Sequence, residues 1–334
     1  MATKLEISEL DFDGIKTNLR NFLSQQDEFR DYDFEGSGMS VLLDLLAYNT
    51  HYLGYNANMV ANEMFLDSAD LRSSVVSKAK QVGYTPTSST SADAVVDVVV
   101  NNATGASLTM SRGTKFTTTV NGISYSFVNN TELTITPSDG VYKFSSVKLN
   151  EGTLLNFKYT ANTSDTDQRF IIPNNNVDTN TLTVKVQESS SDATTNTYTL
   201  ATGITGLDST SKVYFLQEVE NGRFEVYFGD GVLGKAIADG NIVIFDYVVC
   251  NRNAPNGATT FTLSGTVGGF SSATVTTISN ATNGAGPESI ESIKYNAPRD
   301  YTSQDRAVTA DDYKVLVKSL YANAQSVQVY GGED

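Results

Sequence analysis

Residues 34–86 read FEGSGMSVLLDLLAYNTHYLGYNANMVANEMFLDSADLRSSVVSKAKQVGYTP. On a helical period, the first half of this stretch carries two apolar stripes. One stripe holds Leu42, Leu45, Leu46, Asn49 and Leu53, and the other holds Val41, Tyr48, Tyr52, Tyr55 and Met59. Asp44 is the only Asp, Glu, Lys or Arg between Gly36 and Glu63. A surface helix normally has one apolar stripe and one charged face, so two faces of this helix are predicted to be covered.

Two interpretations fit such a helix. It lies at the centre of its own domain, or it packs against another chain, with tyrosines supplying the amphipathic contact area that is enriched at interfaces. The second interpretation predicts an interface built from Val41, Leu42, Leu45, Leu46, Tyr48, Tyr52, Tyr55, Met59, Phe65 and Leu66.

Shorter helices are predicted on both sides. The next one covers residues 67–82, with Asp67 or Ser68 as N-cap and Gly83 as the C-terminal stop. An amphipathic helix upstream begins at Asp11 or Asp13 and carries Ile15, Leu19, Phe22 and Leu23 on its apolar face. The N-terminal quarter, residues 1–84, is therefore predicted to be a helical arm.

The pattern changes after a Ser/Thr-rich linker at residues 85–93. Strand-like runs separated by turn residues predict an antiparallel β-rich domain over residues 94–283. The runs are residues 94–100, 115–120, 124–128, 141–149, 154–160 and 181–186. Asn121-Gly122 is a strong two-residue hairpin signal. Residues 189–196 are predicted to be a mobile loop, and the absence of a fixed-period repeat disfavours a β-helical fibre.

Helical spacing returns at the C-terminal end. One helix is predicted within residues 284–298, with Pro287 near its start and Pro298 after its end. Another covers residues 308–320, with Thr309 as N-cap, and residues 326–330 read as a strand. Residues 284–334 therefore predict the start of a C-terminal α/β domain that is incomplete. The overall fold class is α+β and multidomain.

Composition excludes several classes of function. The 334 residues carry a formal net charge of −15 and no cluster of Lys and Arg, which disfavours nucleic acid and anionic membrane surfaces as partners. No apolar run approaches the length of a membrane span, and the N-terminus does not read as a signal peptide. Cys250 is the only cysteine, so an intrachain disulfide is impossible, and it is predicted to be a buried hydrophobe.

The motifs that suggest chemistry have simpler explanations. Gly229-Asp230-Gly231 resembles a phosphate cradle, but the Lys-Ser/Thr pair and following helix of a P-loop are missing, so a tight turn is predicted. Asp165 and Asp167 alternate like calcium ligands without the central Gly or the distant Glu. His51 is the only histidine and is predicted to pack within the apolar helix. We therefore predict no catalytic, cofactor or metal site.

Three stretches carry a family resemblance. They are residues 31–88, which include the apolar helix, FEVYFGDGVLGKAIADGNIVIFDYVV at 224–249, and APRDYTSQDRAVTADDYKVLV at 297–317. Together they resemble the N-terminal portion of the large wedge subunit in baseplates of T-even-type contractile-tailed phages, within the baseplate-J-like group. Residues 224–249 are similar to the hairpin motif of that group, and residues 297–317 are similar to its C-terminal entry motif. Residues 95–210 match only in strand-rich character.

The resemblance implies a structural subunit with no enzymatic activity. In the family, two copies pair within each wedge, wedges join into an inner ring around the tail hub, and smaller wedge proteins clamp the helical bundle. Receptor contact then rearranges the baseplate and triggers sheath contraction. The implied partners are a second copy of the chain, other wedge proteins and neighbouring wedges. The implied location is the tail baseplate of the virion, assembled in the host cytoplasm.

An alternative function is that of a β-rich cell-surface or glycan-binding or glycan-degrading tail protein. The Ser/Thr/Asn-rich strands and the 17 tyrosines favour it, since such surfaces bind sugars through aromatic and polar groups. The absence of Trp and the long apolar helix both disfavour it.

Overall fold

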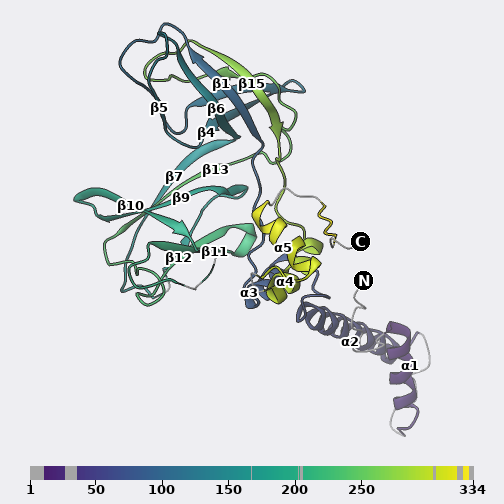
Figure 1. Cartoon of the computed structure of the whole chain (residues 1–334). Helices are drawn as coiled ribbons and strands as arrows, with labels where there is room; N and C mark the ends of the chain where they lie inside the picture. The colour runs from purple at the N-terminus through teal and green to yellow at the C-terminus, as the bar shows by residue number, and fades with distance from the viewer. Residues whose placement is uncertain are drawn as a thin grey trace. The chain divides into compact units, whose positions relative to one another are not determined.

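The structure is a computed structural model that describes residues 11–26, 36–166, 168–201, 203, 206–303, 306–321 and 326–330. The chain divides into two compact units (Figure 1). One comprises the residues up to Gly83 together with Ile290–Tyr301, and the other comprises Tyr84–Ser289 together with the residues from Thr302 onward. The first unit is helical and the second is dominated by antiparallel strands, which confirms the predicted α+β class.

Two helices form the N-terminal part of the first unit. Helix α1 (Phe12–Leu23) begins as predicted at Asp11, whose carboxylate accepts hydrogen bonds from the backbone N–H groups of the first turn. Helix α2 (Gly38–Glu63) begins at Ser37, whose Oγ accepts from the Ser40 N–H at 3.0 Å. Helix α1 packs against α2, and Figure 1 shows that it lies beside only one end of the longer helix.

Helix α3 (Arg72–Gln81) starts later than the sequence predicts. Neither Asp67 nor Ser68 is its N-cap, because the chain folds back in a turn after α2. The Ser68 Oγ donates to the Asn62 carbonyl at 2.7 Å, and the Glu63 carboxylate accepts from the backbone N–H groups of Asp70 and Leu71. The C-terminal stop is confirmed, since Gly83 adopts a φ of 81°.

The C-terminal helices differ from prediction in one boundary. Helix α4 (Ile290–Ser303) continues through Pro298, which was predicted to lie beyond its end. Proline removes one N–H donor and its ring crowds the carbonyl four residues earlier, yet α4 extends five residues past it. Helix α5 (Ala310–Leu320) begins with a capping box formed by Thr309 and Asp312, so its N-cap is confirmed. Residues 326–330 form no strand in the structure, so the strand predicted there is wrong.

The first sheet of the second unit has six strands in the order β14-β3-β4-β6-β1-β15. Strands β14 and β15 contact each other, so the sheet curls into a barrel-like form. Asn121 and Gly122 join β3 to β4 with φ angles of 50° and 82°, which confirms the predicted hairpin. The strands are β1 (Asp93–Val100), β3 (Lys115–Val120), β4 (Ile123–Asn129), β6 (Tyr142–Glu151), β14 (Thr262–Leu263) and β15 (Ala273–Thr282), and β2 (Leu108–Met110) pairs with β5 (Leu133–Ile135) beside them.

The second sheet has seven strands in the order β7-β13-β9-β10-β11-β12-β8. Its pairs are antiparallel except β10 with β11. Residues 189–196, predicted to be a mobile loop, instead end one strand and begin the next. The strands are β7 (Thr153–Thr160), β8 (Phe170–Ile171), β9 (Val177–Ser189), β10 (Asp192–Leu200), β11 (Val213–Glu218), β12 (Phe224–Phe228) and β13 (Ile242–Val249), with a short 3-10 turn η1 at Glu220–Gly222.

The similarity of residues 224–249 to a hairpin motif predicts that the two strands in this range pair with each other, and this prediction is wrong. Strand β12 pairs with β11 and β8, whereas β13 pairs with β7 and β9. The connection between them, residues 229–241, forms no strand, so the chain does not resume a strand directly after Lys235. Both strands are central in their sheet, and each finds its partners elsewhere in the chain.

Each sheet has its own hydrophobic core. Phe116, Phe127, Phe144 and Leu149 lie in the first core, and Phe245, Tyr247 and Val226 lie in the second. Polar contacts connect them. Ser91 donates its N–H and its hydroxyl to Asp178 at 2.9 and 2.6 Å, so the Ser/Thr-rich segment that leads into β1 is held against β9.

Candidate functional site

The surface of α2 carries many exposed large apolar side chains. Nine of the ten predicted interface residues are exposed, with values such as 64% for Val41, 62% for Leu45 and 63% for Tyr55. Leu66 is half-buried in the turn that follows the helix. Monomeric proteins rarely leave so many adjacent large apolar side chains exposed on one helix, which marks α2 as a candidate contact surface.

Helical geometry explains which side of α2 is already used. Ser40, Leu43, Ala47 and Gly54 are buried, and their spacing of three, four and seven residues places them on a single face. The side chains on this face are small except for Leu43, so another helix can approach closely. Lys16 of α1 forms an ion pair with Asp44 next to this face. The rest of the circumference of α2 stays open.

The exposed part divides into two stripes of different chemistry. The aromatic stripe consists of Val41, Tyr48, Tyr52, Tyr55 and Met59, and the rings of Tyr48 and Tyr52 lie 5.9 Å apart between centroids. The aliphatic stripe consists of Leu42, Leu46, Leu53 and Val60, with Leu45 between the two stripes. Val60 and Met64, which are 62% and 59% exposed, were not among the predicted residues, although the same helical spacing points to Val60.

The interpretation of α2 as a helix enclosed by its own domain does not fit these exposures. Within the described part of the chain, no element covers either stripe, since α1 reaches only the opposite face. His51 is half-buried at the edge of that opposite face and is not part of the stripes. Eight of the ten predicted interface residues therefore lie on α2 and face solvent, whereas Phe65 and Leu66 lie in the turn that follows it.

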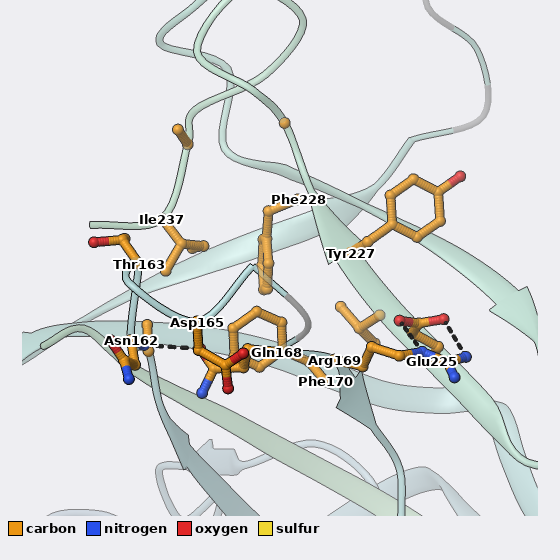
Figure 2. A pocket seen from close by; sticks show the side chains of 14 residues that line it. Asn162, Thr163, Asp165, Gln168, Arg169, Phe170, Glu225, Tyr227, Phe228 and Ile237 are labelled. Carbon is orange, nitrogen blue, oxygen red and sulfur yellow. Dashed lines mark hydrogen bonds and ion pairs between the residues drawn. The ribbon is translucent and has the colours of Figure 1, made fainter. Parts of the chain in front are cut away.

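A second feature is a hollow of mixed polar and apolar lining in the second unit (Figure 2). Its lining comes from residues 161–163, 165 and 168–170, from residues 225–229 at β12, and from residues 236–237. Arg169 and Glu225 face each other there with two parallel hydrogen bonds of 3.0 Å. Gln217 also donates to Glu225 at 2.7 Å, and hydrogen bonding to Glu225 raises the pKa of Arg169. Gln168 accepts from the Asn162 N–H. Arg169 and Glu225 thus satisfy each other within the hollow.

The Gly-Asp-Gly sequence forms the predicted turn. The Asp230 Oδ1 accepts from the N–H groups of Val232 and Leu233 at 2.9 and 3.0 Å, and these bonds lower the pKa of Asp230. Asp165 lines the hollow, whereas Asp167 lies outside the described residues. In the described ranges, no three His, Cys, Asp or Glu side chains gather as metal ligands would.

The remaining predicted residues have structural positions. Cys250 is 3% exposed, and burial raises the pKa of its thiol to about 11, so it is the buried hydrophobe that the sequence predicts. None of the described helices is both long and apolar enough to span a bilayer.

Comparison with known proteins places both units in one family. Residues 11–84 match the family described as the helical domain of gp6-like baseplate wedge proteins, a range that covers α1 to α3. Residues 156–255 match the third domain of bacteriophage baseplate wedge protein gp6, a range that covers most of the second sheet.

A curated relative extends the similarity over almost the whole chain. Baseplate wedge protein gp6 of Enterobacteria phage T4 is 30% identical over 346 residues, which cover 96% of this chain and 51% of that protein. The chain thus spans about half the length of the relative. A cryo-EM structure of the anti-feeding prophage baseplate, 6-fold symmetrised, aligns over 92% of this chain and 56% of its own at 11% identity, but its TM-score of 0.33 is too low to establish a shared fold. On the two domain matches and the T4 relative, this chain belongs to the gp6-like family of bacteriophage baseplate wedge proteins.

Proposed function

We propose that the chain is a structural, non-enzymatic subunit of a contractile-tail baseplate wedge, and that α2 is the surface through which it assembles. The observation that carries the proposal is the exposure of two apolar stripes on a helix from a domain of a baseplate wedge family. Burying such side chains contributes roughly 1.5–3 kcal/mol each, so a helix with this many of them has a large driving force for association.

The proposed partners are a second copy of the chain and other wedge proteins. Two stripes of different chemistry suit two neighbours, because each can cover one side of α2 while α1 covers the third. The acidic net charge of −15 disfavours nucleic acid and anionic lipid as partners. The proposed location is the baseplate of the virion, after assembly in the host cytoplasm, where a buried unpaired thiol such as Cys250 remains reduced.

The resemblance also leads us to propose a part in the rearrangement that triggers sheath contraction. A ring that changes shape without falling apart needs one contact that persists and another that slides or rotates. We assign the persistent contact to the helical arm around residues 36–82, since a large apolar contact is costly to open. The β-rich unit would then form the body of the wedge, in keeping with domains at residues 1–84, 94–283 and 284–334.

The test is a charged substitution on the open part of α2 in the full chain. Leu45 is 62% exposed, so Leu45→Asp should leave the fold of the isolated chain intact. In an assembled bundle the same carboxylate would be buried without a partner, at a cost of several kcal/mol. We expect a loss of self-association in light scattering, together with an unchanged circular dichroism spectrum and melting temperature of the dilute chain.

A matched control is Asn18→Asp, which adds the same charge at an exposed position of α1. This variant should associate like the parent chain. Assembly of the Leu45→Asp variant with the parent mass would show that α2 is not the contact surface. A parent chain that stays monomeric at all concentrations would contradict self-association altogether.

A further inference from the structure

Three segments of the chain run between the two sheets of the β-rich unit, and they meet at Glu151. They are the segment before β1, the link from β6 to β7 at Glu151 and Gly152, and the segment after β13. The Glu151 N–H donates to the Ala92 carbonyl at 2.8 Å, and the Asn251 N–H donates to the Glu151 carboxylate at 2.8 Å. The packing is tight, since a Cβ at Gly152 would lie 2.3 Å from the Val249 carbonyl oxygen. Glu151 therefore bonds to both of the other segments.

Glu151 is a buried acid whose hydrogen-bond donors are neutral. The residue is 0% exposed. One carboxylate oxygen accepts from the Asn251 N–H, and the other accepts from the Asn251 Nδ2 at 2.6 Å. Neutral donors alone do not recover the cost of removing a carboxylate from water. Burial therefore raises the pKa of Glu151, although the two bonds from Asn251 act in the opposite direction.

The elements around Glu151 supply no compensating positive charge. The titratable groups of these elements that lie towards the crossing are Asp93, Lys148, Asp178, Cys250 and Arg252.

Both cations in this set have other partners. Lys148 forms an ion pair with Asp93, and the Arg252 guanidinium donates to the Asn176 side chain. Asp178 adds a second buried acid, which accepts from Ser91. Within the described ranges, no Lys or Arg forms an ion pair with Glu151, so its environment favours the neutral form.

The contact between Glu151 and Asn251 can accommodate a proton. A protonated carboxyl donates through one oxygen, so one of the two donors from Asn251 has to give way. The side-chain amide of Asn251 does this by turning over, which places its Oδ1 against the new O–H while the backbone N–H keeps its bond. In the present arrangement this Oδ1 accepts no hydrogen bond from the described residues, and Asn251 is exposed, so the turn costs no other contact.

We propose that Glu151 and Asn251 form a proton-linked clasp between the two sheets. Glu151 takes up a proton as the pH falls, and the Asn251 amide turns over so that the sheets stay joined in both states. The clasp belongs to the β-rich unit and is independent of assembly through α2.

The clasp gives folding stability a defined pH dependence. Because the pKa of Glu151 is higher in the folded chain than in the unfolded chain, the folded chain holds the proton more tightly. The stabilisation from this proton is complete at pH values below the pKa of the unfolded chain. It is lost as the pH rises through the pKa of the folded chain.

The first test is Glu151→Gln in the full chain, since glutamine resembles the protonated acid in shape and in its donor and acceptor. Urea unfolding followed by circular dichroism is compared between variant and parent from about pH 5 to about pH 8. We expect the urea midpoint of the variant to rise relative to that of the parent as the pH increases. The matched control is Glu132→Gln, at an exposed position of the same unit, whose difference from the parent should stay constant. A constant difference for Glu151→Gln, or one that changes in the opposite direction, would overturn the clasp.

The second variant, Asn251→Asp, tests the partner and does not depend on how Glu151→Gln folds. Two carboxyl groups then face each other and repel once both are ionised. The urea midpoint of this variant should fall relative to that of the parent as the pH increases. An Asn251→Asp chain that follows the parent at every pH would show that the amide is not part of the clasp and would refute the proposal.

Discussion

At the scale of single residues, position 229 requires glycine for a reason other than positive φ. The predicted tight turn can use glycine for positive φ on either side of Asp230, and Gly231 adopts such a φ at 87°. Gly229 does not. Its role is close approach, since a Cβ at this position would lie 2.3 Å from the Leu233 carbonyl oxygen and 2.4 Å from the backbone of Gly234. The turn therefore depends on the absence of a side chain at Gly229 and on the hydrogen bonds to Asp230.

The corresponding prediction compares two substitutions in this turn. Gly229→Val should lower the free energy of unfolding by about 1–3 kcal/mol, because the backbone of residues 233 and 234 must move to make room. Asp230→Asn keeps a side-chain oxygen that can accept from Val232 and Leu233, so it should change stability little. Urea unfolding followed by circular dichroism measures both. Equal stability of the two variants would contradict the close-approach role, and calcium, magnesium or nucleotide binding lost in Asp230→Asn would reopen the case for a ligand site.

At the scale of elements, the sequence predicts where a helix begins when the residue that caps the helix lies next to its first turn. The starts of α1 and α5 follow from Asp11 and Thr309, each of which bonds the first turn of its own helix. The start of α3 does not follow in this way. Its neighbouring N–H groups bond to Glu63, which lies eight residues before Leu71 and belongs to the end of α2. The missed pairing of β12 and β13 has two causes. Strand β12 pairs with β11, the strand just before it in the chain, whereas β13 pairs with β7 and β9, which lie much earlier.

The start of α3 gives a prediction with an internal control. Glu63→Ala removes the acceptor for the N–H groups of Asp70 and Leu71 and should destabilise the helical unit by about 1 kcal/mol, the usual cost of losing a helix cap. Asp67→Ala removes the residue that the sequence predicts as the cap and should have little effect. Hydrogen exchange of the amides at residues 70–76 distinguishes the two. Faster exchange in Asp67→Ala than in Glu63→Ala would restore the assignment of Asp67 as the N-cap of α3.

At the scale of the whole β-rich unit, polar contacts join two separate cores. Arg112, in the turn after β2, donates to the Thr181 carbonyl at 3.0 Å and to the Thr183 hydroxyl at 2.9 Å in β9. Glu151 is fully buried where β6 leads into β7, and both of its oxygens accept hydrogen bonds from Asn251. Burial raises the pKa of Glu151 against the effect of these bonds. These hydrogen bonds hold together two sheets that have no strand in common.

The prediction at this scale concerns Arg112. Arg112→Leu removes two hydrogen bonds between the cores and leaves a buried carbonyl with fewer donors, so it should lower stability by about 1–3 kcal/mol. Lys143→Leu removes a half-exposed ion pair with Asp97 inside the first sheet, where solvent screening should make the loss of stability small. Differential scanning calorimetry compares the two. A smaller effect for Arg112→Leu than for Lys143→Leu would show that the cores do not depend on this contact.

The candidate site was predictable from the sequence in its residues but not in its geometry. The two stripes of α2 follow from helical spacing and the scarcity of charge, and their exposure agrees with that pattern. The sequence could not show which face α1 covers, because the small residues Ser40, Ala47 and Gly54 give a weak hydrophobic signal.

The near-absence of charge on α2 has a consequence for the behaviour of an assembled tail in its surroundings. The one acidic residue of the helix interior, Asp44, is already paired with Lys16 of the same chain. An assembly through the open stripes would therefore depend little on ionic strength, since salt screens charges and leaves apolar contacts intact. The same composition removes electrostatic steering, so association would proceed at ordinary rates of roughly 10⁵–10⁶ M⁻¹s⁻¹. An assembly of this kind would form at such ordinary rates and keep its apolar contacts at both low and high salt concentration.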